Sequence, residues 1–119
     1  MNFHYAKRKN YSWRPFMNQL QSLEQFEELK NGSTVFVFSA DWCPDCHFID
    51  PFMPEVIEKF NSYTFIEVNR DQFLDLCIEL GIIGIPSFLV YEKGNELGRF
   101  VSKDRKTQEE IEDFISNLK

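Results

Sequence analysis

The sequence predicts an α/β fold, in which a central mixed β-sheet of four to five strands is flanked by helices on both faces. The chain has 119 residues, of which 43% are hydrophobic, and this suffices for one domain with a single core. Strand-like and helix-like runs alternate along most of the chain, which favours parallel strands covered by helices. Two strand-like runs near the end are joined by a short turn, which adds antiparallel pairing.

The first half of the chain contains the first two expected strands and the first two helices. A short edge strand begins within residues 15–20, and a capping box at Ser22 then starts a helix. Residues 34–40, TVFVFSA, are apolar almost throughout, as expected of a central strand buried on both faces. An amphipathic helix follows over residues 43–60, and Pro51 within it is expected to produce a kink.

The second half repeats the alternation and ends in a hairpin and a helix. Residues 63–68 have the β-branched and aromatic character of a strand, and residues 71–80 have the pattern of a helix that the following glycine ends. Residues 87–92 and 96–102 flank the turn sequence KGN and predict a hairpin. A capping box at Thr107 starts the last amphipathic helix.

Charge is distributed unevenly along the chain. Residues 1–23 contain four basic and no acidic residues, so they carry +4 of the formal net charge of −6 and the remainder carries −10. An acidic body repels phosphates and argues against nucleic-acid binding. We expect a basic, solvated N-terminal extension over residues 1–19 and a folded domain over residues 20–119.

Composition also indicates the cellular compartment. No apolar run approaches the ~20 residues of a membrane-spanning helix, and no apolar stretch of a secretory signal follows the basic residues near the start. Three cysteines, of which one pair is close in sequence, do not make a disulfide framework. We therefore expect a cytoplasmic protein without a membrane span.

Cys43 and Cys46 lie where the central strand gives way to a helix. A structural zinc site needs four ligands, and only Cys77, His47 and His4 remain as candidates, so a metal is not expected. A structural disulfide closing so short a loop would constrain little of the unfolded chain. A helix N-terminus stabilises a thiolate, which favours redox exchange. Cys43 is then the solvent-facing nucleophile and Cys46 the shielded resolving thiol.

The motif ADWCPDC (residues 40–46), Pro51, the segment GIIGIPSFLVYEKG (residues 81–94) and the closing amphipathic helix occur together in this order. Over residues 20–118 the sequence thereby resembles the thioredoxin family. The resemblance implies the thioredoxin fold and a substrate-binding role for Ile85 and Pro86.

In that family the proline is in a cis peptide bond against the active-site disulfide, and the residue before it, here Ile85, offers backbone hydrogen bonds to an extended substrate. Trp42 is expected to be a partly exposed ring that shields Cys46 and contacts substrate. Pro44 and Asp45 replace the glycine and proline that are typical between the two cysteines.

Asp45 opposes thiolate formation at Cys43, whereas His47, when protonated, favours it. The pentapeptide WCPDC also occurs in small cytosolic thioredoxin-related proteins that act on a narrower range of substrates.

Two further departures concern the interior and the groove. Typical thioredoxins have a buried aspartate six residues before the first cysteine and a lysine on the next strand, and here Val37 and Glu67 occupy those positions. The usual internal base for the resolving thiol is therefore missing. Ser102 replaces a common glycine near the substrate groove.

The sequence thus predicts a thiol–disulfide oxidoreductase that reduces protein or small-molecule disulfides through Cys43 and Cys46, with a narrower substrate range than a general thioredoxin. The alternative is a thioredoxin-fold protein-binding module with a redox-sensing CxxC motif. The expected partners are disulfide-containing proteins or low-molecular-weight thiol substrates and a reductase that regenerates the dithiol. We expect a monomer with no bound cofactor or metal and no nucleic-acid partner.

Overall fold

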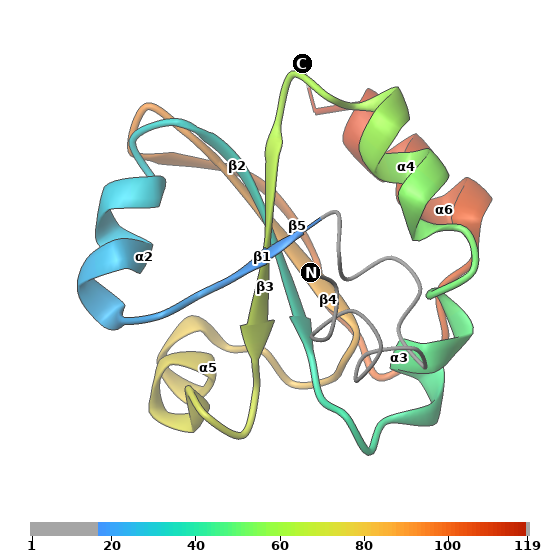
Figure 1. Ribbon diagram of the computed structural model, residues 1–119, viewed down its shortest axis with the longest axis horizontal. Coiled ribbons are helices and arrows are strands. Elements are labelled where there is room, and N and C mark those ends of the chain that lie inside the picture. The colour runs from blue at the N-terminus through green and yellow to red at the C-terminus, as the bar shows by residue number, and fades with distance from the viewer. Residues whose placement is uncertain (1–16, 119) are drawn as a thin grey trace, which may run out of the picture.

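The computed structural model describes residues 17–118 and contains a five-stranded mixed sheet in the order β1-β3-β2-β4-β5 (Figure 1). The first three strands pair in parallel, and β4 and β5 add antiparallel pairs. The strands are β1 (Asn18–Gln19), β2 (Ser33–Ser39), β3 (Thr64–Asn69), β4 (Ser87–Glu92) and β5 (Asn95–Phe100). The helices are α2 (Leu23–Leu29), α3 (Pro44–Phe48), α4 (Met53–Lys59), α5 (Leu74–Leu80) and α6 (Gln108–Ser116). The predicted α/β fold is confirmed.

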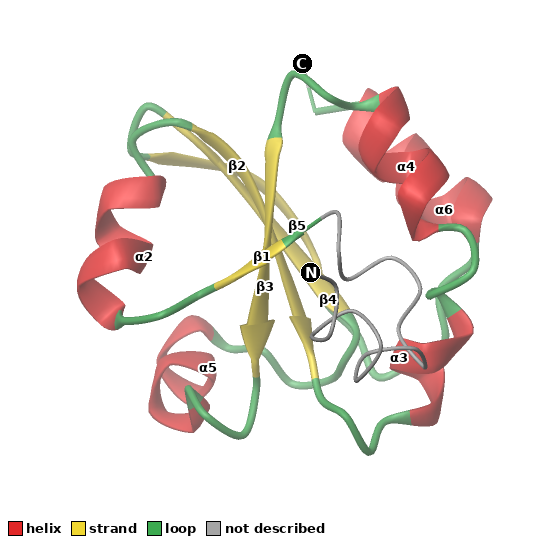
Figure 2. Ribbon diagram, in the orientation of Figure 1, coloured by secondary structure: helices red, strands yellow, loops and turns green. Residues whose placement is uncertain are grey.

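Helices cover both faces of the sheet: α2 and α5 lie on one side, and α3, α4 and α6 lie on the other (Figures 1 and 2). Strand β2 crosses the middle and supplies both cores. Val35 and Val37 pack in the core beneath α4 and α6, whereas Phe36 and Phe38 pack in the core beneath α2 and α5. All four side chains are fully buried, which explains the continuous apolar run in the sequence.

The predicted caps and turns are present. The Ser22 hydroxyl accepts a hydrogen bond from the backbone N–H of Gln25, but the Gln25 side chain accepts from the N–H of Gln21 rather than from that of Ser22, so the capping box predicted there is half formed. The capping box at the start of α6 has both of its hydrogen bonds. The hairpin between β4 and β5 turns at Lys93 and Gly94, whose φ values of 53° and 87° are those of a tight hairpin turn. Gly81 ends α5 in the left-handed conformation, with φ of 73°.

The expected helix over residues 43–60 is wrong as a single kinked helix, because the structure has two helices there. α3 ends at Phe48, and α4 begins at Met53 after a turn that contains Pro51. A proline lacks the N–H that would continue the helical ladder, and its ring crowds the preceding turn. The interruption leaves α3 as a five-residue platform for the two cysteines.

Other helix and strand boundaries differ by a few residues from those predicted from the sequence. α5 begins at Leu74 rather than residue 71, because the Asn69 side chain accepts hydrogen bonds from the N–H groups of Asp71 and Gln72 and shapes a turn before the helix. The sheet already includes Asn18 and Gln19, which pair with β3 as the expected edge strand. The rest of the predicted basic extension, residues 1–16, lies outside the described residues.

Candidate active site

The cysteine pair lies at the carboxyl end of β2, where the chain turns into α3. Cys43 is the N-cap of this helix, and its backbone N–H bonds to the carbonyl of Ala40 at 3.3 Å. Pro44 occupies the first turn, where a missing N–H costs nothing. The local sequence therefore fixes the cysteine at the start of the helix.

The sulfur of Cys43 receives polar contacts from two segments of the chain. The backbone N–H of Cys46 donates to Sγ of Cys43 at 3.2 Å, and the Cys43 thiol lies 3.7 Å from the carbonyl oxygen of Ile85. A backbone N–H aimed at the sulfur stabilises a thiolate at this position. The sequence predicted this arrangement from the position of the motif.

Cys43 is less exposed than expected, whereas the burial of Cys46 is that of a shielded thiol. Cys43 is 4% exposed and Cys46 is 1% exposed, so the expectation of a solvent-facing Cys43 is wrong in its degree. The cause is the loop before β4, because Ile85 packs against the small cluster of Ala40, Cys43 and Cys46.

The peptide bond between Ile85 and Pro86 is cis, as the family resemblance implied. Pro86 is buried, and Ile85 is partly exposed with its carbonyl oxygen facing Cys43. These two residues therefore lie beside the cysteines, where an extended substrate is expected to bind.

Trp42 is a partly exposed ring beside the site, as expected, with 59% of its surface accessible. Its indole Nε1–H donates to Oδ2 of Asp71 at 2.8 Å, and the guanidinium of Arg70 lies 5.7 Å from the ring centroid. Both partners come from the turn after β3. Sequence reasoning did not identify Asp71, although residues that follow adjacent parallel strands meet at one edge of a sheet.

Asp45 has a cationic partner from a distant segment. Nε of Arg105 lies 2.9 Å from Oδ1 of Asp45, and the same guanidinium lies 4.4 Å from the ring centroid of Phe48. The arginine therefore offsets the repulsion that the carboxylate exerts on a thiolate at Cys43.

His47 is held within its own segment of the chain. Its Nε2 lies 2.6 Å from the carbonyl oxygen of Asp41, and its Nδ1 lies 3.2 Å from Oδ2 of the buried Asp50. A carbonyl oxygen only accepts hydrogen bonds, so Nε2 carries a hydrogen. Both ring nitrogens of His47 thus have partners within residues 41–50, and these partners fix the orientation of the ring.

Beneath the cysteines the internal acid of typical thioredoxins is absent. Val37 is fully buried, and its partner on β3 is Glu67, which is 2% exposed. The Glu67 carboxylate accepts hydrogen bonds from the hydroxyl of Ser39 at 2.7 Å and from the amide of Gln19 at 3.1 Å. Glu67 thus links β1, β3 and β2, and hydrogen bonds compensate its burial.

Cys77 lies in the opposite core, beneath α2 and α5. Burial raises the pKa of its thiol to about 11, with a smaller lowering contribution from Arg70. A thiol with so high a pKa is protonated at neutral pH and reacts slowly. Cys77 is therefore a buried, unreactive thiol.

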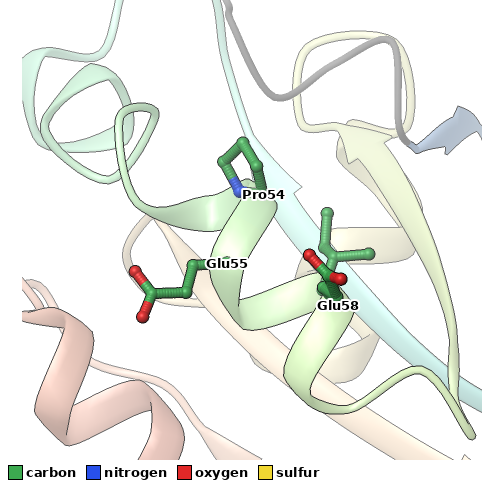
Figure 3. A pocket seen from close by; sticks show the side chains of 4 residues that line it. Pro54, Glu55 and Glu58 are labelled. Carbon is green, nitrogen blue, oxygen red and sulfur yellow. The ribbon is translucent and has the colours of Figure 1, made fainter.

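A surface pocket of about 550 Å³ lies away from this chemistry, over α4 (Figure 3). It is lined by Pro54, Glu55, Ile57 and Glu58, all from this one helix. Within residues 17–118, no group of three or more histidine, cysteine or acidic side chains is placed to hold a metal ion. None of the helices in the described part of the chain has the length and apolar character needed to cross a membrane.

Comparison with known proteins agrees with this geometry. The family model for thioredoxin matches residues 17–117. Thioredoxin from Oryctolagus cuniculus is 33% identical over 106 residues, which cover 86% of this chain and 98% of that protein. Mitochondrial thioredoxin-2 from Schizosaccharomyces pombe is 31% identical over 87% of this chain and 81% of its own length.

Solved structures show the same fold. Mitochondrial thioredoxin 3 from Saccharomyces cerevisiae, in its oxidized form, superposes with a TM-score of 0.75 over 91% of this chain and 98% of its own, at 22% identity. The chain therefore belongs to the thioredoxin family of thiol–disulfide oxidoreductases.

Proposed function

We propose that the protein reduces disulfides through a dithiol in which Cys43 attacks and Cys46 resolves. The thiolate of Cys43 attacks one sulfur of a substrate disulfide and displaces the other as a thiolate, which forms a mixed disulfide. Cys46, after losing its proton to water, attacks Cys43 and releases the reduced substrate. Two electrons pass to the substrate, and the enzyme is left with a Cys43–Cys46 disulfide that a cellular reductase must reduce.

The observation that carries this proposal is the helix N-cap at Cys43, where the N–H of Cys46 points at Sγ from 3.2 Å. Trp42, Ile85 and Pro86 are the proposed substrate contacts, because Trp42 directly precedes Cys43 and the carbonyl oxygen of Ile85, next to Pro86, lies 3.7 Å from its sulfur. Pro44, Asp45 and His47 are proposed to modulate its reactivity through the helix start and local charge.

We further propose a cytoplasmic monomer that acts in the reducing direction on a narrower set of substrates than a general thioredoxin. The ion pair of Asp45 and Arg105 places a fixed pair of charges beside the cysteines. A substrate that places a negative charge beside Asp45, or a positive charge beside Arg105, would bind less well.

Trapping tests the proposed function. A Cys46→Ser variant lacks the resolving thiol, so we expect stable mixed disulfides between Cys43 and its substrates, detected by non-reducing electrophoresis and mass spectrometry. The matched control is the double variant Cys43→Ser, Cys46→Ser, which should trap nothing. Partners that bind the double variant equally well would instead support a binding module whose cysteines are secondary.

The order of alkylation tests the division of roles between the thiols. In the reduced native protein at near-neutral pH, iodoacetamide should label Cys43 first, because its sulfur faces the helix start and a backbone N–H. Cys77 should react only on unfolding, since burial raises its pKa to about 11. Peptide mass spectrometry that found Cys46 or Cys77 labelled before Cys43 would contradict the assignment.

A further inference from the structure

Lys106 is a buried lysine just before α6, and the reaction described above does not use it. It is 1% exposed, and lysine is rarely buried without a partner. Its Nζ donates to the carbonyl oxygens of Ser102 at 3.2 Å and Asp104 at 2.9 Å, and it lies 5.3 Å from the ring centroid of Phe100. Two of the three N–H groups of the ammonium are thus bound by backbone carbonyls.

The acidic groups around Lys106, one of them a thiol, come from three segments. Burial lowers the pKa of its ammonium, and four groups oppose that change: Asp104 in its own loop, Cys46 and Asp45 on α3, and Glu110 on α6. Asp45 already pairs with Arg105, and the Glu110 carboxylate accepts a hydrogen bond from the backbone N–H of Thr107, the N-cap of α6.

Among these four groups, only the thiol of Cys46 is buried as deeply as the lysine, at 1% exposed. A charge interacts more strongly with another charge where water is excluded. Arg105 pairs with Asp45 at 2.9 Å, so the lysine after Arg105 and the cysteine after Asp45 lie on two segments that this ion pair holds together. The lysine is therefore placed to act on the resolving sulfur, which is the one deeply buried group among these four.

Backbone packing holds the loop of Lys106 in place. Gly84, just before Ile85, lies against residues 102 and 103 so closely that an added Cβ would come 2.7 Å from the Cα of Lys103. The carbonyl of Ser102, which this glycine also contacts, is one of the two that bind the ammonium. The position of Lys106 is thus fixed relative to the loop that packs on the cysteines.

We propose that the Lys106 ammonium stabilises the Cys46 thiolate during resolution of the mixed disulfide, in a chain whose usual internal base is replaced by Val37. This inference rests on the proposed function. Cys46 gives its proton to water, and the resulting thiolate is paired with the ammonium. Its sulfur then forms a bond to Cys43, the bond between Cys43 and the substrate sulfur breaks, and the substrate leaves as a thiolate that solvent protonates.

The test separates the attack of Cys43 from its resolution by Cys46. The protein carries Cys77→Ala and is fully reduced. It is mixed in a stopped-flow instrument with dithiobis(nitrobenzoate), an aromatic disulfide that serves as the substrate. Attack by Cys43 releases one coloured thionitrobenzoate, and attack by Cys46 on the mixed disulfide releases a second. Loss of the first release would overturn the proposed function, whereas the inference about Lys106 concerns only the second.

Neutral replacements of Lys106 should slow the second release. Lys106→Gln removes the charge but keeps an N–H donor for the two carbonyls, and Lys106→Met removes both. At pH 7 we expect both variants to resolve the mixed disulfide about tenfold more slowly than the parent, because Cys46 would ionise about one pH unit higher. At alkaline pH Cys46 is ionised in all of the proteins, so the difference in rate should disappear. Lys106→Arg should keep most of the rate. Lys103→Met, which removes the same charge from an exposed position of the same loop, should change nothing.

A rate loss that is equal at all pH values, or an unchanged pH profile in Lys106→Gln, would overturn the proposal. A second measurement does not depend on how the lysine variants fold. In a Cys43→Ser variant, thiolate absorbance should show that Cys46 ionises at lower pH than Cys77, although both thiols are 1% exposed. If Cys46 ionises no more readily than Cys77, the ammonium gives it no assistance.

Discussion

Replacing Val37 with aspartate is expected to destabilise the protein by ~3–5 kcal/mol at neutral pH, because it buries an unpaired charge. The Val37 side chain is fully buried, and its partner across the strand pair is the carboxylate of Glu67. Burial and this like charge both oppose ionisation of the new group. Denaturant midpoints of the variant and the parent would measure the loss.

The loss should depend on pH with a sign that identifies its cause. Burial would raise the folded-state pKa of the new carboxyl above its unfolded value, so the penalty should be small at acidic pH, where the group is protonated in both states. It should grow as pH rises through the unfolded pKa and level off above the folded pKa. Val37→Asn, which has the same shape and no charge, is the control and should show no such dependence. Parallel profiles for the two variants would contradict this account.

The same aspartate should speed resolution of the mixed disulfide near neutral pH. General-base assistance is typically worth ~10²–10⁴-fold, and Val37 provides none. Adding Glu67→Gln should recover part of the lost stability, because it removes the like charge and keeps an acceptor for the hydroxyl of Ser39. If Val37→Asp leaves the pH profile of resolution unchanged, the absent acid does not limit this enzyme.

The sequence predicted best the features that depend on neighbouring residues. Strand β2 follows from the unbroken apolar run VFVF (residues 35–38), because a strand buried on both faces has no polar alternation. The caps at Ser22 and Thr107 are local patterns of four residues, and in both the side chain of the cap accepts the predicted backbone hydrogen bond. The placement of Cys43 at a helix start also follows from its immediate sequence.

Features that depend on distant contacts were missed. Arg105 pairs with Asp45 across 60 positions of sequence, and no local pattern indicates that pairing. Lys106 is one of several basic residues in a polar stretch, and its burial follows from the packing of its loop against the loop of Gly84. The depth of Cys43 likewise depends on Ile85, which lies 42 positions away.

A Gly84→Ala substitution is expected to cost ~1–3 kcal/mol, because its methyl group has no room. The added carbon would overlap the carbonyl of Ser102 and come 2.7 Å from the Cα of Lys103. Both neighbours are backbone atoms, so no side chain can rotate away and the whole loop must shift. Gly32→Ala is the matched control, because its nearest neighbours would lie at 3.8 and 4.0 Å and its φ is not in the left-handed region.

Gly84→Ala should also affect the reaction, because the loop that must move carries Arg105 and Lys106. The ion pair to Asp45 spans only 2.9 Å, and the buried ammonium depends on the carbonyl of Ser102, so a displacement of a few tenths of an ångström would weaken both. We expect a lower denaturant midpoint together with slower release of the second thionitrobenzoate, while Gly32→Ala should match the parent in both. Equal midpoints for the two alanine variants would show that the loop tolerates a side chain at residue 84. A lower midpoint with an unchanged resolution rate would show instead that the loop contributes to stability without positioning the groups that act on Cys46.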